Sequence, residues 1–143
     1  MRYLFAGGGT GGHINPALAI ARYIKEKQSD AQILFVGSTG GMEERLVPAA
    51  GFKLKTVTVS GFRRKLNLKN IRHNISAVRK VFTATAESEK ILREFKPDVC
   101  IGTGGYVCGP ILRKAKKMGI PVLIHESNAF PGVTTKLLSK KAV

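Results

Sequence analysis

The chain has 143 residues, of which 43% are hydrophobic, and its 24 lysines and arginines against 9 acidic residues give a net charge of +15. The length suits one domain, the absence of any run of roughly 18 apolar residues excludes a membrane-spanning helix, and the short apolar N-terminus is not a secretory signal. We therefore expect a cytoplasmic protein whose basic surface attracts polyanions: nucleic acid, anionic lipid or phosphorylated substrates.

Apolar, β-branched runs alternate along the chain with segments of helical periodicity. The runs predict strands at 2–7, 31–37, 53–59, 98–102 and 121–126. Helices are predicted near 14–28, 42–50, 70–95, 106–118 and 132–141. This alternation is typical of a parallel sheet with helices on both faces. We predict an α/β, doubly wound, Rossmann-like fold that forms a single domain over residues 1–143.

The first helix carries two local signals. Asn15 followed by Pro16 predicts its start, since an amide side chain can cap a helix and proline suits a position that needs no N–H. An apolar stripe then predicts its buried face, at Ile14, Ala17, Leu18, Ala21 and Ile24.

The turn before this helix holds five glycines in the six positions from Gly7 to Gly12. It fits the dinucleotide fingerprint GxGxxG, but the second strand ends in FVGSTGG without the acid that would hold a ribose, and the nearest acids, Glu43 and Glu44, lie in the next helix. It also nearly fits a P-loop, but His13 stands where that motif needs lysine. Neither a nicotinamide nor a P-loop nucleotide is favoured.

What both motifs share is a set of bare backbone amides beside a helix N-terminus, which together attract anions. A plain strand–helix turn needs only one or two glycines, so five indicate a ligand close to the backbone. A second such turn, IGTGGYVCGP, follows the fourth strand. Both turns fall at the carboxyl edge of the sheet, where α/β folds bind ligands. Two turns on one edge suit a diphosphate or a sugar-diphosphate.

Three segments, GGGTGGHINPALAIA, GTGGYVCGP and HESNAFPGVTTKLL, closely resemble the N-terminal half of the MurG family of peptidoglycan N-acetylglucosaminyltransferases. The resemblance covers all 143 residues and keeps the family's order of motifs. It implies a GT-B glycosyltransferase with two Rossmann-like domains. This chain would be the N-terminal, acceptor- and membrane-side domain, and the C-terminal domain that holds the uridine nucleotide is absent from the sequence.

The resemblance also implies an activity. The family transfers GlcNAc from UDP-GlcNAc to the C4 hydroxyl of MurNAc in lipid I (undecaprenyl-pyrophosphoryl-MurNAc-pentapeptide), with inversion, and forms lipid II in peptidoglycan synthesis. It works as a peripheral protein at the cytoplasmic face of the bacterial cell membrane. We expect the isolated chain to have little transferase activity. The alternative is a natural half-enzyme, a binding module that needs a separate nucleotide-binding partner chain.

Site residues follow from the same resemblance. Contacts to the donor's GlcNAc are assigned to Thr10, Gly11, Gly12 and Asn128. The lipid I diphosphate is assigned to the first glycine turn together with Gly104, Gly105 and Tyr106. The chain departs from the family pattern at Ser127, where glutamine is usual, and at Cys108, where serine is usual.

An inverting transfer needs a base to take the proton of the acceptor hydroxyl. His13 is one candidate, because a helix N-terminus disfavours the imidazolium and keeps the ring neutral; a capping or orienting role is its alternative. Glu126, at the carboxyl end of the fifth predicted strand, is the other candidate base, with an orienting or structural role equally open. No Cys/His cluster or carboxylate pair has metal-ligand spacing, so we predict no metal and no cofactor. Cys100 and Cys108 are expected to be free thiols.

The stretch 62–82 holds seven lysines and arginines and no acid. It either packs an apolar stripe on the sheet or docks on an anionic membrane, with apolar side chains in the interface and cations on the headgroups. We favour the membrane patch, formed by Ile75, Val78, Arg79 and Phe82. Nucleic acid is not an expected partner, since no RNA-binding aromatic motif, zinc spacing or helix-turn-helix pattern is present.

Overall fold

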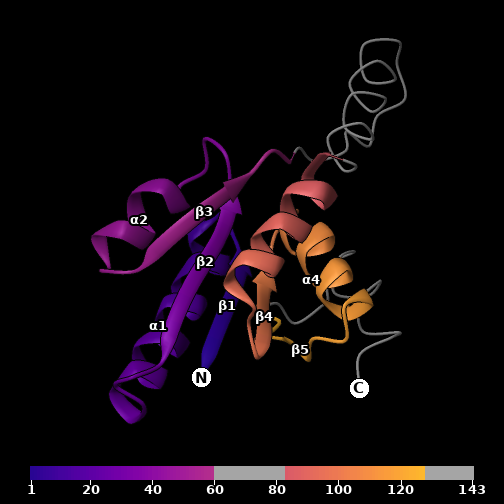
Figure 1. The fold of residues 1–143 in the computed structure, drawn as a ribbon. Helices are drawn as coiled ribbons and strands as arrows, with labels where there is room; N and C mark the ends of the chain where they lie inside the picture. The colour runs from indigo at the N-terminus through magenta and orange to yellow at the C-terminus, as the bar shows by residue number, and fades with distance from the viewer. Residues whose placement is uncertain (60–82, 128–143) are drawn as a thin grey trace.

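The computed structural model describes residues 1–59 and 83–127, in which strands and helices alternate (Figure 1). The elements, in chain order, are β1 (Arg2–Gly7), α1 (Gly11–Lys27), β2 (Gln32–Ser38), α2 (Glu43–Ala49), β3 (Lys53–Val57), β4 (Val99–Gly104), α4 (Cys108–Lys117) and β5 (Val122–Ile124). Residues 83–95 form a further helix. The predicted α/β class is confirmed. The expected helix at 132–141 and the first part of that at 70–95 lie outside the described residues.

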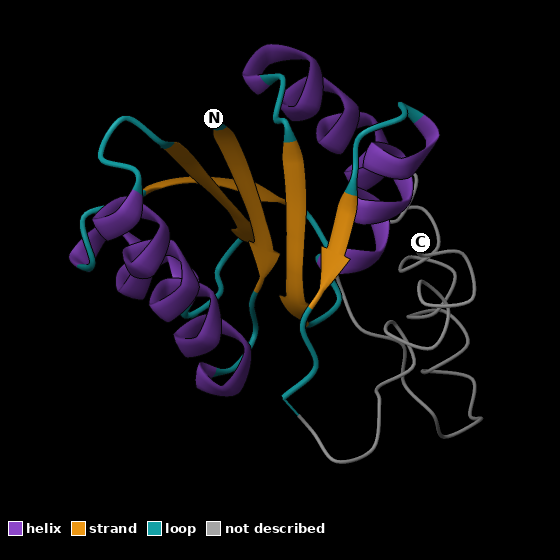
Figure 2. Cartoon of the chain, turned by 90° about the horizontal axis from the view of Figure 1, so that it is seen from below, coloured by secondary structure: helices purple, strands orange, loops and turns teal. Residues whose placement is uncertain are grey.

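The strands pair in parallel in the order β3-β2-β1-β4-β5. β2 and β3 are added on one side of the central strand β1. The chain then crosses to the other side of β1, where β4 and β5 complete the sheet. The loops after β1 and β4 therefore leave neighbouring strands in opposite directions, at the topological switch point where ligands bind in this class of fold. Helices cover both faces of the sheet (Figure 2).

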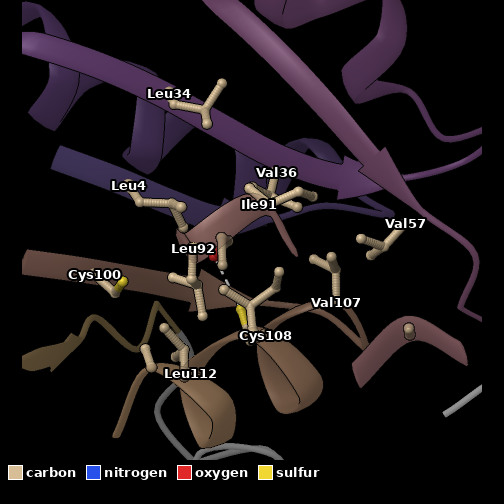
Figure 3. Close-up of a cluster of buried hydrophobic side chains, with 14 residues drawn as sticks. Leu4, Leu34, Val36, Val57, Ile91, Leu92, Cys100, Val107, Cys108 and Leu112 are labelled. Atoms are coloured by element: carbon tan, nitrogen blue, oxygen red, sulfur yellow. Dashed lines mark hydrogen bonds between the residues drawn. The ribbon is translucent and has the colours of Figure 1, made fainter. Parts of the chain in front are cut away.

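Alternation along each strand divides the core between the two faces. On β1, Tyr3 and Phe5 point toward α1 and α2, where Phe5 stacks on Phe35 of β2 with ring centroids 5.0 Å apart. Leu4 and Ala6 point to the opposite face, toward α4 and the helix over 83–95 (Figure 3). Both faces of the sheet are thus packed, and the doubly wound arrangement is confirmed.

The buried stripe of α1 is confirmed, but its predicted start at Asn15 and Pro16 is wrong. The helix begins at Gly11, after Thr10 in an extended conformation, and Pro16 lies inside it. Thr10 accepts the first two helical hydrogen bonds through its carbonyl oxygen, from His13 N at 3.1 Å and Ile14 N at 3.2 Å. None of the helices within residues 1–59 and 83–127 is long and apolar enough to cross a membrane.

Candidate functional site

The two glycine loops lie at the carboxyl edge of the sheet, as predicted, and they contact each other there because β1 and β4 are neighbouring strands. The amide of Gly8 donates to the carbonyl oxygen of Gly104 at 3.3 Å. A Cβ on Gly105 would lie 2.4 Å from the carbonyl oxygen of Gly8, so only glycine permits this approach. Gly104 and Gly105 also take φ values of +115° and +89°, which disfavour other residues. These glycines therefore serve the contact between the loops.

The glycines of the first loop have different functions. A Cβ on Gly7 would lie 2.2 Å from Thr103 Oγ1, and one on Gly8 would lie 2.1 Å from Glu43 Oε1, so both face protein. At Gly9, with φ at +83°, a Cβ would meet nothing within 4 Å, and at Gly12 it would meet only Thr10 Oγ1, at 3.7 Å. The interpretation that all five glycines admit a ligand was too broad, because only the later part of the loop is open.

Three consecutive amides at this open part have no hydrogen-bond partner among the described residues. Among residues 1–59 and 83–127, the N–H groups of Thr10, Gly11 and Gly12 donate to no backbone carbonyl or side chain, whereas those of Gly8 and Gly9 are both bonded inside the protein. Thr10 and Gly12 are exposed. Unpaired amides at a helix N-terminus, supported by the helix dipole, form a ready site for an anion or a sugar oxygen.

His13 lies in the first turn of α1 and is fixed by Thr103 at the end of β4. Its Nδ1 is 3.1 Å from the carbonyl oxygen of Thr103, and Thr103 Oγ1 donates to the carbonyl oxygen of His13 at 2.7 Å. Because a carbonyl oxygen only accepts hydrogen bonds, the ring contact requires the proton on Nδ1. Nε2 of the neutral ring is then the nitrogen that can accept a proton.

The second loop leads into α4 through Tyr106, which is 62% exposed, and Cys108, which is buried. Cys108 Sγ lies 2.9 Å from the carbonyl oxygen of Ala6 and accepts the Gly104 amide at 3.3 Å. Cys108 thus joins the ends of β1 and β4, as a serine hydroxyl could. Burial raises the pKa of its thiol to about 12. Cys100 and Cys108 are both free, which confirms that prediction.

The segment after β5 reaches the first glycine loop. Ser127 Oγ donates to the carbonyl oxygen of Gly12 at 3.4 Å, an acceptor that lacks its helical donor because Pro16 has no N–H. The shorter side chain at position 127 therefore still makes a contact. Glu126 precedes it and is half-buried. Asn128 lies outside the described residues, as do Ile75, Val78, Arg79 and Phe82.

Glu43 was not predicted as a site residue, because in the sequence it stands out only as an acid placed too late to hold a ribose. Its side chain is fully buried and accepts hydrogen bonds from Gly9, in the first loop, and from Ser38, at the end of β2. Burial would raise the pKa of this carboxyl, but hydrogen bonds from the Ser38 hydroxyl and from the amides of Ser38 and Gly9 outweigh it and lower the pKa below its usual range. The available signal was an acid in the first turn of a helix that follows Gly37, Gly40 and Gly41.

Comparison with known proteins identifies the family. The glycosyltransferase family 28 N-terminal domain matches residues 3–143. The chain belongs to this family. A family 28 relative from Thermoanaerobacter sp. (strain X514), named UDP-N-acetylglucosamine–N-acetylmuramyl-(pentapeptide) pyrophosphoryl-undecaprenol N-acetylglucosamine transferase, is 59% identical over 98% of this chain and 37% of its own length. A Lactococcus lactis protein of the same name is 47% identical over 99% of this chain and 38% of its own length.

Solved structures agree with this family 28 assignment. MurG of Acinetobacter baumannii superposes with a TM-score of 0.81 and 35% identity, covering 99% of this chain and 39% of that one. The glycosyltransferase SsfS6 of Streptomyces sp. SF2575, at 16% identity and a TM-score of 0.67, shares the fold alone. The chain spans little more than a third of the curated relatives it matches, and the matched part of MurG is N-terminal. The resemblance to the MurG family is thereby confirmed.

Proposed function

We propose that this chain is the acceptor- and membrane-side half of an inverting glycosyltransferase. The complete enzyme would transfer GlcNAc from UDP-GlcNAc to the C4 hydroxyl of MurNAc in lipid I and so form lipid II. The relatives' shared name supports the reaction. The observation that carries it in this chain is the row of unpaired amides at Thr10, Gly11 and Gly12 beside the His13 ring.

In this proposal His13 is the base. Its Nδ1–H is engaged by the Thr103 carbonyl, which orients the ring and leaves Nε2 to take the proton of the acceptor hydroxyl. The hydroxyl oxygen attacks the anomeric carbon of GlcNAc as the bond to UDP breaks, and attack from the opposite side inverts that carbon. Glu126 is the competing candidate for the base. In its alternative role, its carboxylate orients a sugar hydroxyl.

The amides of the first loop and Asn128 would bind the GlcNAc unit, and the two glycine loops together would hold the lipid I diphosphate. Two features support the second assignment. The loops are in direct contact through Gly8 and Gly104, so one diphosphate can reach both. Tyr106 is exposed beside them and offers a hydroxyl donor. No metal or other cofactor is assigned to this mechanism.

Membrane docking is the remaining part of the proposal. The protein would bind the cytoplasmic face of the bacterial membrane peripherally, through Ile75, Val78, Arg79 and Phe82. The charge of +15 supports attraction to anionic lipid. The chain should therefore bind vesicles that contain anionic lipid, lose that binding as salt is raised, and bind neutral vesicles weakly. Equal binding to both kinds of vesicle would contradict the electrostatic part.

A chimera tests the reaction itself. Residues 1–143 are joined to the remaining C-terminal part of the Thermoanaerobacter relative, and transfer of labelled GlcNAc from UDP-GlcNAc to a lipid I analogue is measured. We expect turnover by the chimera and almost none by residues 1–143 alone. A folded chimera without turnover would refute the proposal. Activity restored by a separately expressed C-terminal half, without fusion, would favour the half-enzyme alternative.

A further inference from the structure

Glu43 is the one charged side chain that is fully buried within residues 1–59 and 83–127. A buried carboxylate is costly unless its charge is paired or hydrogen-bonded. No salt bridge in the described part of the chain involves Glu43, so hydrogen bonds must stabilise its ionised form. Glu43 therefore differs from a solvent-exposed acidic residue, and it has no role in the proposed reaction.

The donors to Glu43 come from two different strand ends. Its Oε1 accepts the amide of Ser38 at 2.6 Å and the Ser38 hydroxyl at 2.5 Å, where β2 ends. Its Oε2 accepts the amide of Gly9 at 3.1 Å, in the loop after β1. Since both amides can only donate, an ionised carboxylate satisfies every donor. A neutral glutamine would turn an NH₂ group toward at least one of them.

Three glycines make room for this side chain. A Cβ on Gly8 would lie 2.1 Å from Oε1 of Glu43, one on Gly37 would lie 2.2 Å from its Cγ, and one on Gly41 would lie 2.5 Å from its carboxylate. These glycines come from the loop after β1, from β2 and from the turn before α2. Part of the glycine content after β1 and around the end of β2 is therefore required by a carboxylate of the protein itself.

In the first glycine loop, the hydrogen bond from Gly9 to Glu43 lies between hydrogen bonds made by the two neighbouring residues. Gly8 is held to Gly104 on one side, and Thr10 begins the hydrogen bonds of α1 on the other. Gly9 is exposed and has a φ of +83°, and a Cβ added to it would meet no atom of the described residues within 4 Å. Glu43 thus holds the middle of a loop whose ends are held without it.

We propose that Glu43 is a positioning residue for the substrate site: by binding the Gly9 amide inward, it sets the turn that leaves the Thr10, Gly11 and Gly12 amides facing the ligand. The proposal rests on the proposed function for the identity of that ligand. The claim about the loop itself is independent of the reaction.

Hydrogen exchange in the 143-residue chain tests the loop. Glu43→Gln is compared with a matched control, Glu44→Gln, which removes the same charge one residue along α2, where Glu44 accepts the Gly40 amide at 3.0 Å and does not contact Gly9 in the described part of the chain. We expect Glu43→Gln to abolish protection of the Gly9 amide and to leave that of Gly8 intact. Glu44→Gln should match the wild type at both amides. Unchanged Gly9 exchange in Glu43→Gln would overturn the proposal.

Kinetics of the chimera test the consequence for substrate. We expect Glu43→Gln to raise KM for the lipid I analogue about tenfold, the scale of one hydrogen bond to a charged group, with kcat changed less than threefold. Glu44→Gln should leave both constants unchanged. A KM equal to that of the wild type, or an equal rise in Glu44→Gln, would overturn the positioning role. An inactive wild-type chimera would refute the proposed function alone, since Gly9 exchange still decides the loop.

A second variant covers the case in which Glu43→Gln does not fold. Ser38→Ala keeps the carboxylate and its bond to Gly9 but removes the Ser38 hydroxyl that holds Oε1. We expect partial loss of Gly9 protection and a smaller rise in KM. Wild-type exchange and KM in Ser38→Ala would then count against the proposal.

Discussion

His13 and Thr103 hold each other through two contacts between α1 and β4: the ring Nδ1 lies 3.1 Å from the Thr103 carbonyl oxygen, and Thr103 Oγ1 donates to the His13 carbonyl oxygen at 2.7 Å. The first contact fixes the tautomer of the ring, and the second fixes the backbone that carries it. Such an oriented imidazole is the usual form of a general base. The pair therefore yields two separate predictions.

Replacing His13 by alanine should remove the base. In the chimera we expect kcat to fall roughly 10²-fold or more, the usual scale for loss of a general base, with a smaller change in KM. The measurement is steady-state transfer to the lipid I analogue. A fall of less than threefold would give His13 a structural role and favour Glu126, for which Glu126→Gln is the matching variant.

Replacing Thr103 by valine should disturb the position of the ring without removing it. Thr103 is 1% exposed, so valine leaves the His13 carbonyl oxygen without its buried donor, at a cost of about 1 kcal/mol in the free energy of unfolding. We expect kcat to fall as well. Thr103→Ser keeps the hydroxyl and is the control, and equal loss of kcat in both variants would show that the hydroxyl does not matter.

The two glycines Gly8 and Gly12 should respond oppositely to alanine. Gly12→Ala adds a methyl group at an exposed position in the first turn of α1, so we expect stability to be unchanged or to rise by up to about 1 kcal/mol. Substrate affinity should fall, because the methyl group occupies the open side of the loop. Gly8→Ala should destabilise the fold, since its methyl group meets Glu43 Oε1. Thermal unfolding and KM of the chimera measure both effects.

How much the sequence could predict depends on the range of the interactions involved. The strand β1 was predicted with its observed bounds because a buried run between charged and glycine residues is a local pattern. That both glycine loops share one edge also followed, since parallel strands bring their carboxyl ends together. Their direct contact did not, because it depends on β1 and β4 being neighbours in the sheet. The start of α1 was missed because Thr10 caps the helix through its backbone alone, with no side-chain hydrogen bond, whereas Asn15 and Pro16 gave a stronger local signal.

The position of Glu43 depends on contacts that no local pattern contains. Its carboxylate meets Gly8 only because β1 and β2 pair in parallel, with Ala6 opposite Val36, and bring the two loops together. In the sequence Glu43 and Gly9 are 34 residues apart. One of the glycines that indicated a ligand, Gly8, is instead required by the close approach of the Glu43 side chain.

The two thiols should be unreactive in the folded protein. Burial raises the pKa of both Cys100 and Cys108 to about 12, and at pH 8 a thiol of that pKa is ionised only about one part in 10⁴. We expect no alkylation by iodoacetamide at pH 8 until denaturant unfolds the chain, and then modification of both residues. Mass spectrometry measures this, and rapid modification of either thiol before unfolding would contradict its burial.

Glu43 should make the stability of the fold depend on pH in the acid range. Because the pKa of Glu43 is lowered in the folded chain, its carboxylate stabilises the fold fully above the ordinary pKa of a glutamate, and this contribution is lost as the pH falls through the lowered pKa. Urea unfolding should therefore show Glu43→Gln to be less stable than the wild type at pH 7, with the difference shrinking toward pH 3. Hydrogen bonds to Lys114 and Lys55 also lower the pKa of Glu89 and Glu94, respectively. The pH dependence of the wild-type unfolding free energy therefore includes contributions from these two residues as well as from Glu43. The comparison between variants isolates Glu43, because both proteins share those surface pairs. A difference that stays constant between pH 7 and pH 3 would mean that packing, and not charge, accounts for the effect of the substitution.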